Sequence, residues 1–206
     1  GQDREQAVAD VEAAVAAAPT HISLYDLTYT GSYAAQVERV KGADARAAAS
    51  AFAEEHYADV VSLLQEAGYV RYEVSNFALP GHECRHNQGY WRGEDYLGIG
   101  ASAVSTVGGE RRTNPSLVAT YLAGDPPEVE RLSEFTRLWE EAMLGLRTTE
   151  GVDETRVGPV LDMARLDLLL EQGCLQRRCG KLRLNPGFMD VGNDVLVALL
   201  LTPDSG

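Results

Sequence analysis

The sequence predicts an α/β fold, part of a (β/α) barrel, followed by a small helical domain. Helix and strand patterns alternate through the first half, with connections long enough to join parallel strands. Two such units are too few to close a barrel. After Pro126-Pro127 the pattern changes to amphipathic helices and one short hairpin, as in a winged-helix-like domain. We therefore expect two domains, residues 1–125 and residues 128–206.

The first predicted helix covers residues 7–18, where alanine and valine recur at helical spacing until Pro19 stops it. His21–Thr28 is the first predicted strand. Its apolar side chains occupy both faces, which a strand inside a parallel sheet requires: Ile22, Leu24, Tyr25 and Leu27.

The second helix–strand unit begins with a long amphipathic helix over residues 45–67, for which Gly68 supplies the stop. A second strand is expected over residues 69–76, where Val70, Tyr72 and Val74 alternate. Parallel α/β proteins keep their sites at such strand ends. Glu73 and Asn76 are therefore candidate site residues, although solvated polar residues at a strand end would give the same pattern.

Residues 79–83 have the composition of a loop, and residues 96–107 are expected to form a glycine-interrupted strand. Gly98–Ala103 loosely fits a dinucleotide-binding pattern, but no helix follows that could hold a pyrophosphate. We expect instead that glycine lets the backbone approach a neighbour or a ligand closely.

The C-terminal domain is predicted to contain three helices and a hairpin. Ser133 caps a helix with an apolar stripe up to Leu146, and a second helix covers residues 162–172. The hairpin pairs Cys174–Arg177 with Lys181–Leu184 through a turn at Gly180, and a last helix covers residues 188–201.

The composition indicates a globular protein with an acidic surface. Hydrophobic residues make up 45% and charged residues 24% of the chain, and the net charge is −13. Such a charge repels nucleic acid and anionic membranes, and no apolar run is long enough to span a bilayer. The three cysteines form no disulfide framework, so we expect a cytoplasmic protein. The start on Gly1, directly before a helical pattern, suggests a cut within a longer protein.

The segment from His82 to Trp91 holds the side chains best suited to bind a metal. His82, Cys84 and His86 alternate and would share one face of an extended chain. Imidazole and thiolate bind zinc, copper or iron, including haem iron, while two aromatic residues at its end offer flat surfaces for a planar ligand. The same residues would also suit an ordinary loop that covers the edge of a core. Zinc would need a fourth ligand.

Four ordered motifs and the C-terminal part resemble one protein family. The motifs are His21-Ile-Ser-Leu-Tyr-Asp-Leu-Thr28, Gly68-Tyr-Val-Arg-Tyr-Glu-Val-Ser-Asn-Phe-Ala78, Cys84-Arg-His-Asn-Gln-Gly-Tyr-Trp91 and Tyr96-Leu-Gly-Ile-Gly100. Together they are similar to the HemW-type haem chaperones, relatives of the HemN-type oxygen-independent coproporphyrinogen III dehydrogenases (also called oxidases). The resemblance implies the rear part of a radical-SAM partial barrel, followed by a HemN-type C-terminal domain.

The resemblance also implies what the chain lacks. The family's front half carries a Cys-x3-Cys-x2-Cys motif that holds a 4Fe–4S cluster, which binds S-adenosylmethionine. No such motif occurs in this sequence. We therefore expect that the chain alone does not cleave S-adenosylmethionine. The family's S-adenosylmethionine contacts at strand ends correspond here to Thr28 and Val104.

The resemblance implies haem binding at His86, Asn87, Tyr90 and Trp91, with His86 as the candidate iron ligand. One departure is Val104, where many chaperone-type members have histidine and the dehydrogenase has an aliphatic residue. Three functions remain open. The chain is part of a chaperone that passes haem to haem-accepting proteins, part of a coproporphyrinogen III dehydrogenase that acts on a porphyrin precursor, or a degenerate fragment without activity of its own.

Overall fold

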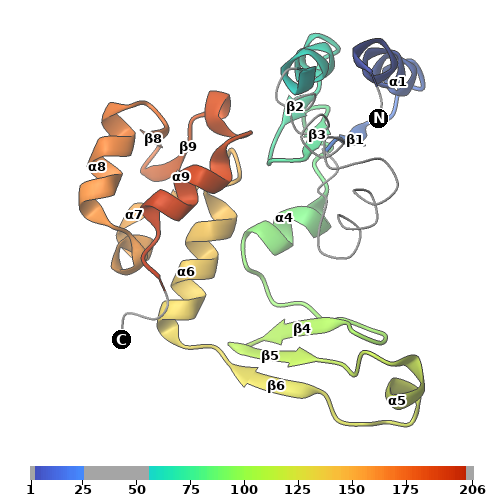
Figure 1. Cartoon of the computed structure of the whole chain (residues 1–206), viewed down its shortest axis with the longest axis vertical. Helices are drawn as coiled ribbons and strands as arrows, with labels where there is room; N and C mark the ends of the chain where they lie inside the picture. Colours follow the sequence, from blue (N-terminus) through green and yellow to red (C-terminus); the bar gives the residue numbers. More distant parts are fainter. Residues whose placement is uncertain (1–2, 26–55, 203–206) are drawn as a thin grey trace, which may run out of the picture. The chain divides into compact units, whose positions relative to one another are not determined.

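The computed structural model of the protein describes residues 3–25 and 56–202. Contacts between residues divide the chain into two units, Gly1–Cys84 and Arg85–Gly206. Figure 1 shows the elements of both units with their labels. Among the described residues no helix is long and apolar enough to cross a membrane.

The first unit is built from helices laid on a small sheet. Its described elements are α1 (Arg4–Ala16), β1 (His21–Ser23), a helix over residues 56–66, β2 (Val70–Arg71) and β3 (Asn76–Ala78). The helix predicted before Pro19 is thus confirmed, and Asp3 begins it with a capping box that includes Gln6. The next predicted helix is confirmed over residues 56–66, and Gly68 follows it with φ +90°. Residues 45–55 lie outside the described residues.

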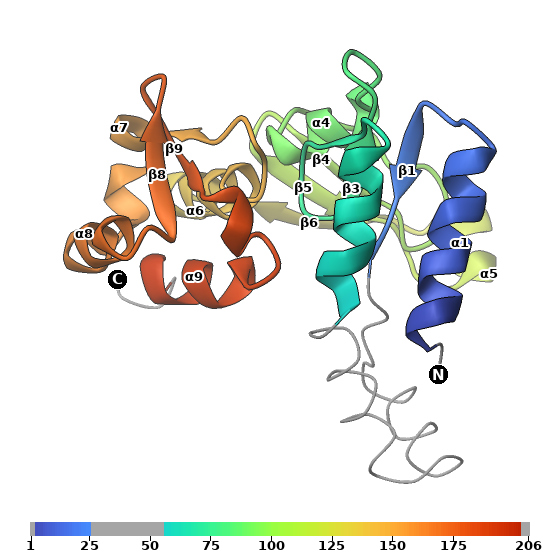
Figure 2. The same cartoon turned by 90° about the horizontal axis from the view of Figure 1, so that it is seen from above.

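The core of the first unit lies between its helices and its sheet. α1 and the helix over residues 56–66 run side by side in Figure 2. Five buried side chains join them to the sheet: Val11, Val60, Leu64, Tyr69 and Phe77. The sequence pattern predicted apolar burial on both faces of the first strand, but Tyr25 is 73% exposed. Residues 26–28 of that predicted strand lie outside the described residues.

The two predicted strands run in the same direction, as the sequence predicted, but a third strand lies between them. The sheet order is β1-β3-β2, and both pairings are antiparallel. The single strand expected over residues 69–76 is broken by a turn at Val74-Ser75, so that β3 returns alongside β2. Because β1 and β2 are each antiparallel to β3, they run parallel to one another with β3 between them.

The second unit begins with a short helix and an antiparallel sheet. Its first elements are α4 (Arg85–Trp91), β4 (Val104–Val107), β5 (Glu110–Thr113), α5 (Val118–Leu122) and β6 (Glu128–Arg131). The strands pair in the order β4-β5-β6. The strand predicted over residues 96–107 is also interrupted, because Tyr96 pairs with Thr106 and the chain turns between them.

The rest of the second unit contains the predicted helices and hairpin. Its elements are α6 (Glu134–Gly145), β7 (Val152–Asp153), α7 (Glu154–Val157), η1 (Gly158–Val160), α8 (Met163–Glu171), β8 (Leu175–Arg178), β9 (Lys181–Leu184), η2 (Pro186–Phe188) and α9 (Gly192–Leu199). Ser133 caps α6 as predicted, and Gly180 lies in the hairpin turn. The last helix, α9, is shorter than predicted.

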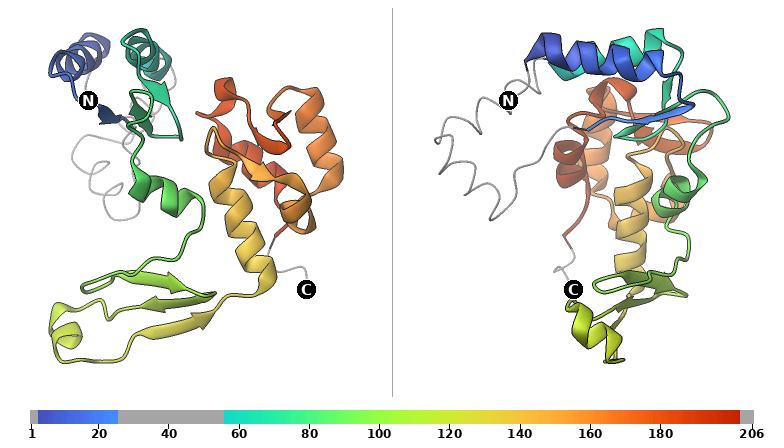
Figure 3. Two further views of the ribbon diagram at one scale, coloured as in Figure 1. Left: turned by 180° about the vertical axis from the view of Figure 1, so that it is seen from behind. Right: turned by 90° about the vertical axis from the view of Figure 1, so that its right-hand side faces the viewer.

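A single apolar cluster holds these elements together. It joins the stripe of α6, through Ala142 and Leu146, to the fully buried Leu166, Leu182 and Leu199. The three-stranded sheet β7-β9-β8 lies against the helices (Figure 3). This order, with a hairpin between α8 and the last helix, fits the winged-helix-like architecture expected from the sequence.

The division into domains at residues 126–127 stays a prediction. β6 lies on the C-terminal side of that point, yet it pairs with β5 along its whole length. β6 then leads into α6 through the cap at Ser133, as Figure 3 shows. Because β6 belongs to the sheet with β4 and β5, the helical part of the second unit begins at α6.

Candidate functional site

The four residues for which the resemblance implies haem binding lie on α4, a helix of seven residues. Its end is a Schellman motif: the Gly93 amide donates to the Tyr90 carbonyl and the Glu94 amide to the Gly89 carbonyl, both at 3.0 Å. Gly93 has φ +66°, the left-handed conformation that this motif needs and that glycine adopts without strain. The chain therefore stops the helix directly behind the aromatic pair.

The helix overturns the prediction that His82, Cys84 and His86 share one face. That prediction assumed an extended chain, whereas His82 and Cys84 precede the helix and His86 lies within it. Among the described residues, no group of three histidine, cysteine or acidic side chains could hold a metal ion. Helical spacing instead places His86 and Tyr90 on one face of α4, one turn apart, and it places Asn87 and Trp91 together in the same way.

His86 is exposed and stands edge-on to a neighbouring ring. The centroids of His86 and Tyr90 are 4.8 Å apart, with an interplanar angle of 90°. Tyr90 is 41% exposed, while Asn87 and Trp91 are half-buried. An imidazole held in this way can present a ring nitrogen to an iron atom, and the tyrosine beside it can contact the edge of a flat ligand.

Tyr96 extends the ring contacts beyond the helix, and the sequence pattern did not assign it to the site. Its ring centroid lies 4.6 Å from that of Tyr90, at an interplanar angle of 57°. It follows the end of α4 by five positions, so helical periodicity gives no hint of it. The sequence signal that could have pointed to Tyr96 is Gly93, which marks the point where the chain turns back after α4.

A carboxylate fixes the C-terminal end of α4. The Arg92 guanidinium donates to Glu150 at 2.9 Å, and Lys181 of β9 donates to the other oxygen of Glu150 at 2.9 Å. The hydrogen bond from Lys181, followed by that from Arg92, lowers the pKa of Glu150 against an opposing effect of burial. The carboxylate therefore ties the helix that carries His86 to the hairpin of the same unit.

The glycine at residue 98 performs the role that the sequence suggested. A Cβ on Gly98 would lie 2.2 Å from the carbonyl oxygen of Val104, which no side chain tolerates. The amide of Gly98 donates to the Ser105 hydroxyl at 2.9 Å. The close neighbour is thus the backbone of Val104 itself, at the start of β4.

One of the two residues expected to contact S-adenosylmethionine, Val104, lies within the described residues. Val104 is half-buried at the start of β4 and pairs with Thr113. Thr28 lies outside the described residues. Their role as cofactor contacts stays a prediction.

Glu73 and Asn76 do meet, but as an internal network. The Glu73 carboxylate is fully buried and accepts hydrogen bonds from the Ser75 amide at 3.1 Å and from the Asn76 side chain. Burial raises the pKa of Glu73, while the hydrogen bonds and the charge of Arg71 oppose the shift. Asn76 also accepts from the Ser23 hydroxyl of β1. Glu73 is therefore not a solvated residue at a strand end, and its carboxylate closes the turn between β2 and β3.

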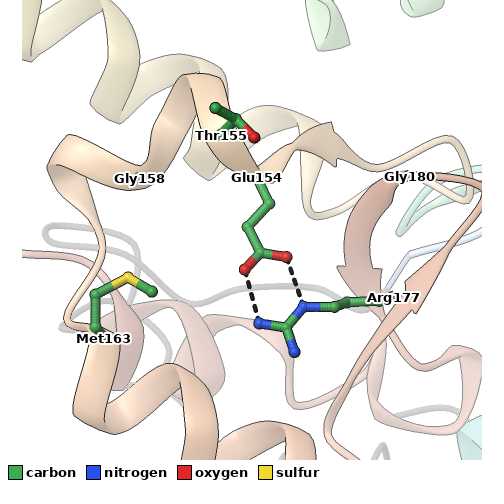
Figure 4. Close-up of a pocket in the computed structure, with 6 residues that line it drawn as sticks. All are labelled: Glu154, Thr155, Gly158, Met163, Arg177 and Gly180. Carbon is green, nitrogen blue, oxygen red and sulfur yellow. Dashed lines mark hydrogen bonds and ion pairs between the residues drawn. The ribbon is translucent and has the colours of Figure 1, made fainter.

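A separate hollow of about 460 Å³ lies in the C-terminal part of the second unit. It is lined by Glu154, Thr155, Gly158, Met163, Arg177 and Gly180. Figure 4 shows Glu154 and Arg177 pointing at one another, and their two hydrogen bonds are both 2.7 Å long. The hydrogen bond from Arg177 lowers the pKa of Glu154. Because the two charges satisfy one another, this hollow presents no uncompensated charge to a ligand.

The cysteines do not suit an iron–sulfur cluster. Cys84 and Cys174 are half-buried and Cys179 is exposed, and all three are free. Cys174 immediately precedes β8, and Cys179 lies in the turn before β9, as the sequence predicted. The cluster that the radical-SAM resemblance implies therefore has no set of ligands among the described residues.

Several curated proteins are similar to this chain. A protein from Synechocystis sp., named heme chaperone HemW, is 38% identical over 160 residues, which cover 72% of this chain and 39% of that protein. Its namesake from Mycobacterium tuberculosis is 33% identical over 181 residues, 85% of this chain and 46% of that protein. The chain thus spans less than half the length of these relatives. No family model matches it.

A solved structure shares the fold. It is described as "Coproporphyrinogen III oxidase (HemN) from Escherichia coli is a Radical SAM enzyme", and it superposes with a TM-score of 0.72. The match covers 96% of this chain and 51% of that chain, at 15% sequence identity. At that identity the likeness concerns the fold: an α/β arrangement followed by helices.

Proposed function

Because this chain belongs to the family of the HemW-type haem chaperones, as a part similar to less than half of their length, we propose that it binds haem and takes part in delivering haem to haemoproteins. The observation that carries the proposal is His86, exposed on α4 with its ring edge-on to Tyr90. Haem-accepting proteins would be its partners, and the cytoplasm its location.

The chemistry around His86 suits a planar iron porphyrin. Imidazole is a common axial ligand of haem iron, and tyrosine and tryptophan provide apolar rings with a polar edge. Arg85 precedes His86, is exposed, and makes no ion pair with any described residue. In contrast, Arg92 and Arg111 are each paired with carboxylates. Arg85, directly beside His86, therefore offers a guanidinium to a haem propionate.

The test is a haem titration of the 206-residue chain and of its His86→Ala variant. We expect the variant to shift the Soret band and to weaken haem binding by roughly tenfold to a hundredfold, because the iron loses its ligand. Absorbance spectra and dissociation constants measure both effects. An unchanged Soret band in His86→Ala would refute His86 as the ligand.

The matched control is His82→Ala. His82 is an exposed histidine four positions before His86, but it lies in the loop ahead of α4. Its replacement should leave the spectrum and the affinity as they are in the unsubstituted chain. A loss in both variants alike would point to nonspecific binding by surface histidines.

A second candidate function is participation in coproporphyrinogen III oxidation. It is favoured by the fold of the solved HemN structure and by Val104, an aliphatic residue where many chaperones have histidine. Competition between haem and coproporphyrin III separates the two candidates. Preference for haem supports the chaperone, whereas preference for coproporphyrin III, which has four carboxylates, supports the oxidation.

A further inference from the structure

Three aromatic rings of the second unit form one continuous series of contacts. The centroid distances are 4.8 Å from His86 to Tyr90 and 4.6 Å from Tyr90 to Tyr96. Both lie within the range in which aromatic pairs attract one another, in edge-on or tilted orientations. The series begins on α4 and ends on the segment that leads towards the sheet β4-β5-β6.

The backbone of Tyr96 is fixed by hydrogen bonds to β4. Its amide donates to the Thr106 carbonyl at 2.9 Å, and the Thr106 amide donates back at 3.0 Å. Thr106 belongs to β4, which pairs with β5 along its length. β5 is itself fixed to α6, because Arg111 donates to both oxygens of Glu140 at 2.7 Å. The Tyr96 backbone is therefore part of a hydrogen-bonded frame.

His86 and Tyr90, in contrast, stand on a helix of only seven residues. Such a helix has little stability of its own in water, and exposed side chains on it sample several rotamers. A side chain that must adopt one rotamer to bind a ligand loses that freedom on binding, at a cost in affinity. Contacts that select the rotamer beforehand remove part of this cost.

We propose that Tyr96 is a positioning residue, which holds the Tyr90 ring and through it the edge-on orientation of the His86 imidazole. The inference rests on the proposed haem binding and deepens it. Tyr96 acts through the contact between its ring and the Tyr90 ring. Loss of the Tyr96 ring therefore leaves His86 available as the iron ligand, but its imidazole is no longer held in one orientation.

The experiment compares Tyr96→Ala with Tyr96→Phe in the full 206-residue chain. Tyr96→Ala should weaken haem binding about three- to tenfold, the range that one aromatic contact supports, while Tyr96→Phe keeps the affinity of the unsubstituted chain. The Soret maximum should stay that of histidine ligation in both. In the haem-free chain, the NMR shifts of the His86 ring protons should move towards those of a free histidine in Tyr96→Ala only.

Tyr121→Ala is the matched control, since Tyr121 is a half-buried tyrosine of the same unit without a ring contact to α4. Should Tyr96→Ala fail to fold, Tyr96→Leu removes the aromatic ring but keeps an apolar side chain at the same position, and it should give the same loss. Normal haem affinity and unchanged His86 shifts in Tyr96→Ala would overturn the inference while leaving the proposed function intact. A chain that binds no haem would overturn both.

Discussion

Glu73 and Glu150 show that the same side chain can carry opposite pKa shifts at different places in one chain. Glu73 is fully buried, and that burial raises its pKa despite the hydrogen bonds that it accepts. Glu150 accepts hydrogen bonds from Lys181 and Arg92, which lower its pKa. The first carboxylate closes a turn, and the second links two elements.

The raised pKa of Glu73 predicts a stability that falls as the pH rises. The native state holds this proton to higher pH than the unfolded chain, whose glutamate ionises near pH 4.3, so ionisation on the way to neutral pH favours unfolding. Glu73→Gln does not titrate. The unfolding free energy of the unsubstituted chain minus that of Glu73→Gln should therefore decline from about pH 4 towards pH 7.

Urea unfolding at a series of pH values measures this difference. Glu66→Gln, at an exposed position on the helix over residues 56–66, serves as the control for the loss of one carboxylate. A difference for Glu73→Gln that stays constant with pH would show that Glu73 ionises alike in the folded and unfolded states.

At the scale of the element, α4 marks the limit of what the sequence pattern could predict. α6 and α8 were predictable because apolar stripes follow the capping residues Ser133 and Asp162. α4 has no such stripe, and Gly89 lowers its helix propensity. Its anchor is Glu150, 58 positions away from Arg92. The residue types of the site could be predicted, whereas their arrangement depends on contacts that sequence spacing does not contain.

The turn between β2 and β3 follows the same logic. Alternation of apolar residues predicted one strand. Instead, the Glu73 carboxylate accepts a hydrogen bond from the Ser75 amide, and the chain turns back at this point. A carboxylate that bonds a backbone amide two positions on competes directly with strand pairing. The strand pattern was present, and a local side-chain contact overrode it.

Glu150→Gln should loosen α4 without unfolding the protein. The ion pairs are about half-exposed, so the global unfolding free energy should change by less than about 1 kcal/mol. The amides of α4 should exchange hydrogen faster, as measured by mass spectrometry on peptides that cover the helix. The lowered pKa implies that the unsubstituted chain keeps this protection above the usual glutamate pKa and loses it as the pH falls through the lowered value.

Glu154→Gln is the control for the exchange measurement. Glu154 pairs with Arg177 in the hollow of the C-terminal part and makes no ion pair or side-chain hydrogen bond with α4. Equal exchange of α4 in the unsubstituted chain and in Glu150→Gln would show that other contacts hold the helix.

On the scale of the whole molecule, charge and cysteine placement separate haem binding from radical chemistry. The chain carries a net charge of −13, and two basic residues of its hairpin are ion-paired, Arg177 to Glu154 and Lys181 to Glu150. The three cysteines are free and form no metal-binding group with other described residues. The proposed haem binding at His86 on α4 can therefore be studied without a 4Fe–4S cluster.

Anaerobic iron–sulfur reconstitution of the chain should give no stoichiometric 4Fe–4S cluster. Such a cluster needs at least three closely spaced thiolates, and the three cysteines here do not provide them. Iron and sulfide analysis together with the absorbance spectrum measures the outcome, and Cys84→Ser should behave like the unsubstituted chain. A stoichiometric cluster would contradict this assignment of the cysteines.

The contact between Gly98 and Val104 also sets how this stretch can vary among descendants of the sequence. Leu97 and Ile99 are 77% and 90% exposed, so replacements there meet few neighbours. Between them, even one methyl group at residue 98 would collide with the backbone of β4. Adjacent codons thus face opposite selection. Substitutions can accumulate at residues 97 and 99, while Gly98 is retained as long as the loop keeps its backbone conformation.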